Sequence, residues 1–327
     1  MKQKILVTGG AGFIGSHLCE KLLQGGYQVV SLDNFNDFYD PKIKKENIRN
    51  IEKNFKSEDF KSYEGDIRIK KELETILAAE KPHGVIHLAA MAGVRPSLLN
   101  PELYVDVNIT GTQILLDACV KAGVHHFIFA SSSSVYGNNE KVPFSESDCV
   151  DFPISPYAAT KKAGELICHA YAHLYPIKID CLRFFTVYGP RQRPDLAIHK
   201  FSKWILEGKE IPVFGKGDTE RDYTYVDDIV DGIMKAWDCN RNAGQSPRYE
   251  IFNLGESRTI GLNQMIACLE KTLNKKAKIK KLPLEPGDVF RTNADISKAR
   301  RMIGYSPVVD FEAGIEKFVK WLLEQSK

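Results

Sequence analysis

Short apolar segments alternate with longer amphipathic segments through the first half of the chain. Residues 5–8, 28–32, 84–90 and 126–130 are apolar runs of strand length. The segments between them space their apolar residues at three or four positions, and the longest of these runs from Glu102 to Lys121. Strands that alternate with helices are typical of a parallel sheet with helices on both faces. The pattern therefore predicts an α/β fold built on a doubly wound parallel sheet.

A glycine-rich turn joins the first apolar run to the first amphipathic segment. The residues Gly9-Gly10-Ala11-Gly12-Phe13-Ile14-Gly15 follow the predicted strand at 5–8 and lead into a helical pattern. Strand, glycine turn and helix in this order form a dinucleotide-binding fingerprint, because glycines let the backbone approach a pyrophosphate and the helix start offers free N–H groups. The second strand ends at Asp33, where this motif has an acidic residue for the adenosine ribose. Since a carboxylate repels a 2′-phosphate, we predict NAD and a Rossmann fold.

Further cofactor-site residues follow from the strand ends, because ligands of doubly wound sheets bind beyond the carboxyl ends of the strands. The predicted cofactor-binding residues in the glycine turn and at the strand ends are Gly9, Gly12, Phe13, Ile14, Gly15, Asp33, Asn34, Asp66, Ile67, Ala89 and Ala90. Asp66 is expected near the adenine amino group. Four serines at 131–134 follow the fifth strand at the same edge, and we predict a functional role for them.

A tyrosine and a lysine stand one helical turn apart at the start of another predicted helix. Ser155 can cap this helix, Pro156 suits its first turn, and Tyr157 and Lys161 lie on one face at i and i+4. A free tyrosine has a pKa of about 10, and a nearby ammonium lowers that pKa. We therefore predict that this pair deprotonates a substrate hydroxyl.

Together these motifs resemble the extended short-chain dehydrogenase/reductase superfamily. The resemblance rests on residues 8–15, on the serines leading to Val135-Tyr136-Gly137, and on Tyr157-x-x-x-Lys161. Residues 33–41, 92–97 and 183–195 are similar to those of UDP-glucuronate 4-epimerases. The resemblance implies NAD-dependent epimerisation at C4 of a UDP-sugar, most simply UDP-glucuronate to UDP-galacturonate, through a 4-keto intermediate.

The resemblance also implies the catalytic and substrate-binding residues. Tyr157 is the expected base, Lys161 is expected to lower its pKa and to hold the nicotinamide ribose, and Ser132 is expected to hydrogen-bond the sugar O4 or its neighbour. On the helices, Asn108, Tyr157 and Lys161 are also expected to bind the cofactor. The predicted substrate-binding residues are Arg95, Ser132, Ser133, Ser134, Tyr157, Thr186, Arg193, Val213, Phe214, Arg221 and Asp288. The hydroxyls of Ser133, Ser134 and Thr186 are expected to hold the uronate carboxylate away from a decarboxylating geometry.

The alternation becomes less regular after about Leu182. We expect residues 1–182 to form the NAD-binding domain and residues 183–327 to form mainly a smaller α/β lobe for the UDP-sugar, with some segments returning to the first domain. Surplus apolar positions on the helices at 102–121 and 157–175 indicate, with the family resemblance, a homodimer joined by a four-helix bundle.

Composition and net charge limit the cellular compartment and the binding partners that we expect. A net charge of +3 gives no reason to expect a nucleic acid or an anionic membrane surface as partner. No apolar run approaches the roughly 20 residues of a membrane span, no signal peptide is recognised, and the cysteines form no Cys-x-x-Cys pair. We expect a cytoplasmic protein without a metal site, since His169 and His173 lack a third ligand.

Three other functions stay open at the level of sequence. The substrate can be UDP-glucose or UDP-N-acetylglucosamine, and a UDP-glucuronate decarboxylase would use the same cofactor. Against the decarboxylase, the loop at 131–134 lacks the acidic residues that relatives with that activity carry. A regulatory NAD-binding protein is the alternative from another class, but it would not need both Tyr157 and Lys161.

Overall fold

The computed structural model describes residues 2–215, 217–244, 248–283 and 291–325. The strands of its central sheet are β1 (Lys4–Thr8), β2 (Gln28–Asp33), β3 (Phe60–Glu64), β4 (Gly84–His87), β5 (His126–Ser132), β6 (Lys178–Phe184) and β11 (Tyr249–Leu254). The helices around this sheet are α1 (Phe13–Gln24), α2 (Pro41–Asn54), α3 (Lys70–Glu80), α4 (Val94–Leu99), α5 (Pro101–Val105), α6 (Thr112–Lys121), α7 (Pro156–Leu174), α9 (Val226–Asn242) and α11 (Ser297–Ile303).

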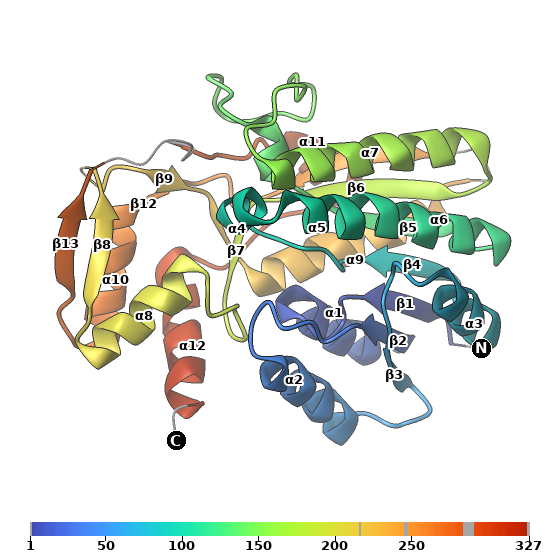
Figure 1. The fold of residues 1–327 in the computed structure, drawn as a ribbon, viewed down its shortest axis with the longest axis horizontal. Helices are drawn as coiled ribbons and strands as arrows, with labels where there is room; N and C mark the ends of the chain where they lie inside the picture. Colours follow the sequence, from blue (N-terminus) through green and yellow to red (C-terminus); the bar gives the residue numbers. More distant parts are fainter. Residues whose placement is uncertain (1, 216, 245–247, 284–290, 326–327) are drawn as a thin grey trace.

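The central sheet has the strand order β11-β6-β5-β4-β1-β2-β3 (Figure 1). Every neighbouring pair in it is parallel. The direction of winding reverses between β1 and β4, which is the position where doubly wound sheets bind their ligands. The predicted fold class is confirmed.

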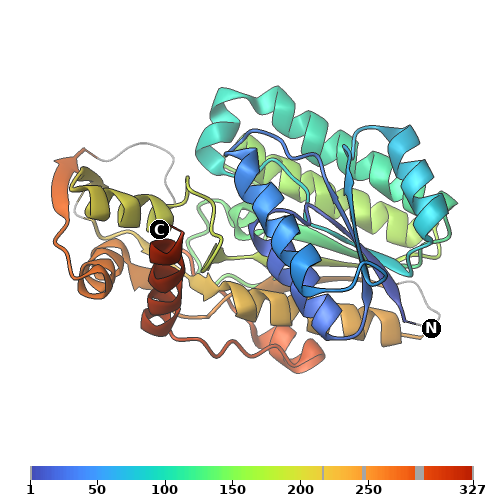
Figure 2. The same cartoon turned by 90° about the horizontal axis from the view of Figure 1, so that it is seen from below.

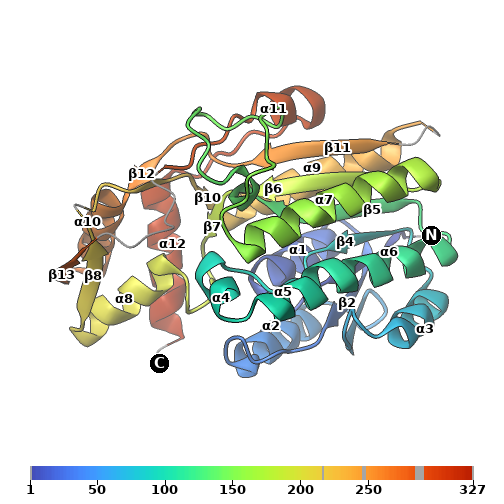
Figure 3. The same cartoon turned by 45° about the horizontal axis from the view of Figure 1, so that its top comes forward.

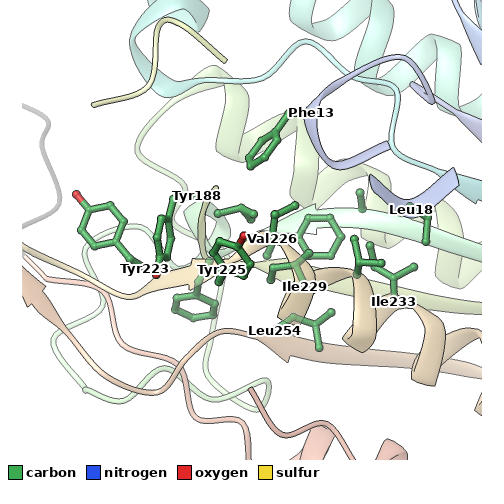
Figure 4. Packing of buried hydrophobic residues seen from close by; sticks show 14 of the residues in the cluster. Phe13, Leu18, Tyr188, Tyr223, Tyr225, Val226, Ile229, Ile233 and Leu254 are labelled. Atoms are coloured by element: carbon green, nitrogen blue, oxygen red, sulfur yellow. The ribbon is translucent and has the colours of Figure 1, made fainter. Parts of the chain in front are cut away.

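Helices cover both faces of the sheet (Figures 2 and 3). On one face α3, α6 and α7 pack over a buried cluster that includes Phe127 and Phe129 of β5. On the other face α1 and α9 pack together over Ile128, because successive side chains of a strand point to opposite faces. Figure 4 shows part of this second cluster, with Ile229 and Ile233 of α9 near the sheet.

A second group of elements lies at the left of Figure 1. It comprises β7 (Thr186–Tyr188), β8 (Glu210–Phe214), β9 (Glu220–Arg221), β10 (Tyr223–Tyr225), β12 (Ile260–Gly261), β13 (Lys278–Leu282), α8 (Ala197–Glu207), α10 (Leu262–Leu273) and α12 (Phe311–Glu324). Three small two-stranded sheets, β10-β7, β12-β9 and β13-β8, organise this group within the described residues. The chain enters it from the carboxyl end of β6, so the group faces the ligand-binding edge of the central sheet.

Three local features differ from the pattern-based expectation. The apolar run at 84–90 is a strand only as far as His87. The long helix expected over 102–121 is interrupted by a π-helical turn, η1 (Asp106–Gly111), between α5 and α6. The serines at 131–134 do not form a simple loop, since β5 continues to Ser132 and a 3₁₀ turn, η2 (Ser133–Tyr136), follows it.

Candidate active site

A cavity of about 530 Å³ opens at the carboxyl edge of the sheet, between the two groups of elements. Its walls come from the glycine turn, the ends of β2, β4 and β5, the start of α7 and the segments around β7 and β9. The structure brings these predicted residues into its lining: Gly9, Gly12, Phe13, Ile14, Gly15, Asp33, Asn34, Asp66, Ile67, Ala89, Ala90, Ser132, Ser133, Ser134, Tyr157, Lys161, Thr186, Arg193 and Arg221.

Four of the predicted residues that the structure describes do not line this cavity. Asn108 is buried behind the wall, where its amide bonds both the N–H and the carbonyl of Met91. The guanidinium carbon of Arg95 lies 5.3 Å from the centre of the Phe214 ring. Val213, which precedes Phe214 in β8, is buried. Asp288 falls outside the described residues. Arg95 and Phe214 therefore meet each other, although they come from opposite groups of elements.

The glycine turn has the geometry that a pyrophosphate requires. Gly9 has φ of +71°, which favours glycine, and a Cβ on Gly15 would lie 2.1 Å from the carbonyl oxygen of Gly9. Helix α1 begins after Gly12, and no side chain caps its first N–H groups. Because uncapped N–H groups at a helix start attract anions, this end of the cavity suits a phosphate group.

Asp33 ends β2 with its carboxylate buried in the cavity wall. It accepts hydrogen bonds from the N–H groups of Ala11 (3.2 Å) and Phe35 (2.9 Å). Burial raises the pKa of Asp33, whereas the ammonium of Lys44, 3.9 Å away, lowers it. The side chain is thus fixed and can accept hydrogen bonds from a ribose.

Asp66 lies at the rim of the same region and is held by neighbours. Arg68 donates to both of its carboxylate oxygens, at 3.0 and 2.7 Å, and Asn34 donates to one of them at 3.0 Å. The hydrogen bonds with Arg68 lower the pKa of Asp66 to about 2. The carboxylate therefore stays charged while Arg68 and Asn34 fix its orientation.

The α7 helix starts as predicted and carries Tyr157 into the cavity. The Ser155 hydroxyl accepts from the N–H of Ala158 at 3.1 Å, and Pro156 occupies the first turn. Burial raises the pKa of Tyr157, and a hydrogen bond with Ser132 together with the charge of Arg193 acts in the opposite direction. The phenol and the Ser132 hydroxyl therefore form one hydrogen-bonding unit.

Lys161 is buried one turn further along α7. Its ammonium donates to the carbonyl oxygen of Ala130 at 2.7 Å and lies 5.2 Å from the centre of the Phe129 ring. Burial lowers the pKa of Lys161 to about 8. The charge that acts on the pKa of Tyr157 in this structure is that of Arg193, whereas the sequence-based expectation assigned that effect to Lys161.

Arg193 reaches the cavity from the second group of elements. Its guanidinium stacks on Phe38 at 4.9 Å, donates to the carbonyl oxygen of Ala92 at 3.3 Å and pairs with Asp195 at 2.7 Å. These contacts fix the Arg193 guanidinium at the cavity, where its positive charge acts on Tyr157.

A buried ion pair lies directly behind the serine segment. Arg183 of β6 donates to both carboxylate oxygens of Glu165 on α7, at 2.8 and 2.9 Å. Glu165 also accepts from the Ser131 hydroxyl at 2.6 Å, and Arg183 donates to the Tyr136 hydroxyl at 2.9 Å. The pair therefore joins α7, β5 and β6 at the residue next to Ser132.

Sequence reasoning did not single out several residues of the cavity wall. Lys44 donates to the carbonyl oxygen of Asn36 at 2.9 Å and lies 5.0 Å from the Tyr39 ring. Phe38 and Thr292 also line the cavity. Lys44 lies on α2, in which half of the 14 residues are charged, so nothing in the pattern distinguished this lysine from its exposed neighbours.

The described residues form neither a metal-binding cluster nor a membrane-spanning helix. Within ranges 2–215, 217–244, 248–283 and 291–325, no three His, Cys, Asp or Glu side chains are grouped closely enough to hold a metal ion. Over the same ranges, the helices lack the combination of length and apolar character that crossing a bilayer requires.

Comparisons with known proteins agree with the motifs and the fold. The model of the GDP-mannose 4,6 dehydratase family matches residues 6–318. A UDP-glucuronate 4-epimerase of Thermodesulfobacterium geofontis is 46% identical over 98% of this chain and 96% of its own length. UDP-glucuronate 4-epimerase 1 of Arabidopsis thaliana is also 46% identical, over 98% of this chain and 76% of its own length.

Among solved structures, the Bacillus cereus UDP-glucuronic acid 4-epimerase in complex with UDP-glucuronic acid and NAD superimposes with a TM-score of 0.90. Its sequence is 39% identical, and the match covers 99% of this chain and all of that one. A UDP-glucose 4-epimerase of Thermotoga maritima with UDP-glucose is 34% identical, with a TM-score of 0.88 over 99% of this chain and all of that one. From the matched length and these identities, the chain belongs to the GDP-mannose 4,6 dehydratase family, within the extended short-chain dehydrogenase/reductase superfamily.

Proposed function

We propose that this protein is an NAD-dependent UDP-glucuronate 4-epimerase that forms UDP-galacturonate. The observation that carries the proposal is the composition of one cavity, where a phenol paired with a serine meets three further hydroxyls and an arginine beside a dinucleotide-binding turn. The UDP-glucuronate 4-epimerases that share 44–46% of this sequence support the choice of sugar.

The residues of the cavity fit NAD. The uncapped start of α1 is suited to the pyrophosphate, and the fixed carboxylate of Asp33 is suited to the adenosine ribose. The backbone at Ala89 and Ala90 forms the floor beside the glycine turn. When bound, NAD supplies the hydride acceptor and donor that oxidation and reduction at C4 require.

Tyr157 is the proposed acid and base at the sugar O4. As the phenolate it accepts the O4 proton, and as the phenol it returns the proton to O4 after the ring carbon has been inverted. Ser132 and Arg193 stabilise the phenolate, since both act to lower the pKa of Tyr157. Lys161 is proposed to hold the nicotinamide ribose from its position at Ala130.

The uronate carboxylate is proposed to lie among neutral hydroxyl donors. Ser133, Ser134 and Thr186 all line the cavity. Hydroxyl donors can hydrogen-bond a carboxylate without forming the bidentate ion pair that an arginine would form with it. Arg221 and, from its position over Phe214, Arg95 are proposed to serve the diphosphate and uracil end.

The test is to incubate the purified protein with UDP-glucuronate, without and with added NAD, and to identify the products by NMR. We expect UDP-galacturonate, and no UDP-pentose or CO₂. Tyr157→Phe, which keeps the ring and removes the hydroxyl, should abolish product formation while leaving NAD binding measurable. Interconversion of UDP-glucose and UDP-galactose with no turnover of UDP-glucuronate would reject the proposed substrate and favour the alternative epimerase.

We further propose a homodimer that pairs the helices around α7. Five exposed apolar side chains lie on three helices that contact one another, namely Leu98 and Leu99 on α4, Val105 on α5, and Leu166 and Leu174 on α7. Sedimentation velocity should report a dimer for the native chain and a monomer for Leu166→Glu. Val308→Glu changes a residue of similar exposure just before α12 and serves as the control. A native monomer at micromolar concentration would contradict the proposal.

The two parts of the chain are proposed to bind different ligands. Residues 1–182 bind NAD, and residues 183–327 bind mainly the UDP-sugar, with β11 returning to the central sheet. The proposal places the enzyme in the cytoplasm, because its seven cysteines are free and suit a reducing compartment.

A further inference from the structure

A chain of hydrogen bonds runs beneath the floor of the cavity, with His87 at its centre. The side chains of Thr8, His87 and Thr112 are each almost completely buried. The Thr8 hydroxyl lies 2.7 Å from Nδ1 of His87, and the Thr112 hydroxyl lies 3.0 Å from Nε2. The imidazole therefore bridges the end of β1 to the start of α6.

The hydrogen-bond partners assign the position of every proton in this chain. Thr112 donates its only hydroxyl proton to the carbonyl oxygen of Asn108 at 2.7 Å, so it must accept from Nε2 of His87. Nδ1 of His87 then carries no proton and accepts from Thr8. Burial, together with the ammonium of Lys161, lowers the pKa of His87 to about 3, which keeps the ring neutral at working pH.

At its first end, the chain is attached to the backbone that borders the proposed cofactor site. The N–H of Ala89 donates to the Thr8 hydroxyl at 3.3 Å. The backbones are also in close contact here, since a Cβ on Gly9 would lie 2.8 Å from the nitrogen of Ala89. The glycine turn after β1 and the segment after β4 are thus held against each other through Thr8.

At its second end, the chain is attached to the π-helical turn and, from there, to α7. The Thr112 hydroxyl bonds back to a carbonyl four residues earlier, inside the segment where η1 departs from an α-helix. A threonine hydroxyl that donates to the carbonyl oxygen four residues earlier competes with the backbone hydrogen bonds of the helix. Such a bond is a known cause of local irregularity in an α-helix. In this turn Asn108 faces Met91 and also donates to the hydroxyl of Thr160 at 3.0 Å.

The last link reaches the residue that carries the proposed chemistry. The Thr160 hydroxyl donates to the carbonyl oxygen of Tyr157 at 2.9 Å. Two sets of hydrogen bonds, joined through the backbone and side chain of Asn108, therefore connect Thr8, next to the glycine turn, to the first turn of α7. Buried hydrogen bonds in series polarise one another, and the loss of a single member leaves two partners unsatisfied.

We propose that His87, in its Nε2–H form, is a positioning residue that fixes the cofactor-binding backbone and the Tyr157 helix relative to each other. It touches neither ligand, and it acts through Thr8 on one side and through Thr112 and Asn108 on the other. The inference rests on the NAD binding of the proposed function but not on the identity of the UDP-sugar. NAD retention and turnover should therefore decline together when the chain is broken at either end.

The test uses nearly isosteric variants of the two threonines. Thr112→Val and Thr8→Val each remove one hydroxyl, and Thr112→Ser restores it. Ser202→Ala is the matched control, because the Ser202 hydroxyl is equally buried and bonds back to the carbonyl of Ile198 at 2.7 Å, in a helix away from the cavity. The measurements are exchange of bound NAD for isotope-labelled NAD, kcat and KM for UDP-glucuronate, and urea unfolding.

We expect Thr112→Val and Thr8→Val each to speed NAD exchange and to lower kcat by about tenfold, which is the effect of one lost buried hydrogen bond. Thr112→Ser should return both values to within about twofold of the native protein, and Ser202→Ala should change unfolding alone. The double valine variant should lose less than the product of the two single effects, because each change breaks the same chain.

Valine variants that unfold more easily yet exchange NAD and turn over at the native rate would overturn the inference, since His87 would then be only structural. Independent effects of the two threonines would overturn it as well. Failure of the native protein to bind NAD would reject the proposed function and this inference with it. Normal NAD binding that is insensitive to Thr112→Val would reject the inference alone.

Discussion

The ion pair between Glu165 and Arg183 offers a test of how the serine segment is held in place. Both side chains are 1% exposed, and the carboxylate receives three hydrogen bonds, two from Arg183 and one from Ser131. Glu165→Gln keeps the shape of the side chain and removes its charge. The guanidinium of Arg183 would then remain buried without a counter-ion.

The expected cost is large because the site excludes water. Removing one partner of a buried ion pair destabilises a protein by about 3–5 kcal/mol, mostly through the charge that remains. That is a substantial part of the roughly 5–15 kcal/mol by which folded proteins are stable. An exposed pair behaves differently, so Glu46→Gln, which breaks the solvent-exposed pair with Arg49, should cost only about 0.5 kcal/mol.

Urea unfolding followed by circular dichroism measures both changes under the same conditions. Turnover of UDP-glucuronate should also fall in Glu165→Gln, because Ser131 and Arg183 then share one neutral amide oxygen, which is a weaker acceptor than the carboxylate that fixes Ser131 beside Ser132. The double variant Glu165→Leu with Arg183→Met replaces the pair by apolar side chains of similar size. It should recover much of the lost stability, since neither buried charge remains.

Two results would refute this reasoning. A loss below about 1 kcal/mol for Glu165→Gln would mean that Arg183 finds another counter-charge or solvent. A double variant that loses the sum of the losses measured for Glu165→Leu alone and Arg183→Met alone would mean that the residues stabilise the fold independently.

Three further predictions concern the cavity itself. Ser132→Ala removes a hydrogen bond that lowers the pKa of Tyr157, so the rise of kcat with pH should shift to higher pH, whereas Ser132→Thr should keep the native profile. Asp33→Ala should weaken NAD binding about tenfold in a titration monitored by calorimetry, and a change of less than twofold would show that Asp33 does not bind the ribose. Gly15→Ala should prevent NAD binding, because its Cβ would lie 2.1 Å from the Gly9 carbonyl oxygen, and an unchanged affinity would contradict the assigned turn.

The features that the sequence predicted well are local. The glycine turn, the Ser155 cap and the one-turn spacing of Tyr157 and Lys161 depend on neighbours within a few residues, and the structure has each of them. The strand alternation was also sufficient to predict a parallel sheet. In these places propensity, spacing and turn chemistry agree, which is when reasoning from a pattern succeeds.

The features that the sequence did not reveal depend on contacts between distant residues. The π-helical turn at 106–111 involves Thr112 and a histidine that lies 25 positions earlier in the chain. The burial of Lys44 results from the packing of α2 beside the cavity rather than from the pattern of that helix. One signal could have been used, since Asp180 and Arg183 are charges placed among apolar residues in β6, and a charge that is buried in a sheet requires a partner.

The electrostatic environment of Tyr157 is made by both parts of the chain. Burial alone makes the phenol a weaker acid, which opposes its use as a base near neutral pH. The opposing effects come from Ser132, at the end of β5, and from Arg193, which lies beyond β7 and stacks on Phe38. Because Lys161 is turned toward Ala130, the cation that favours the phenolate here is supplied by the second part of the chain. The acidity of Tyr157, the proposed catalytic base, therefore depends on how the segment around Arg193 lies against the central sheet, and not only on the helix that carries Tyr157.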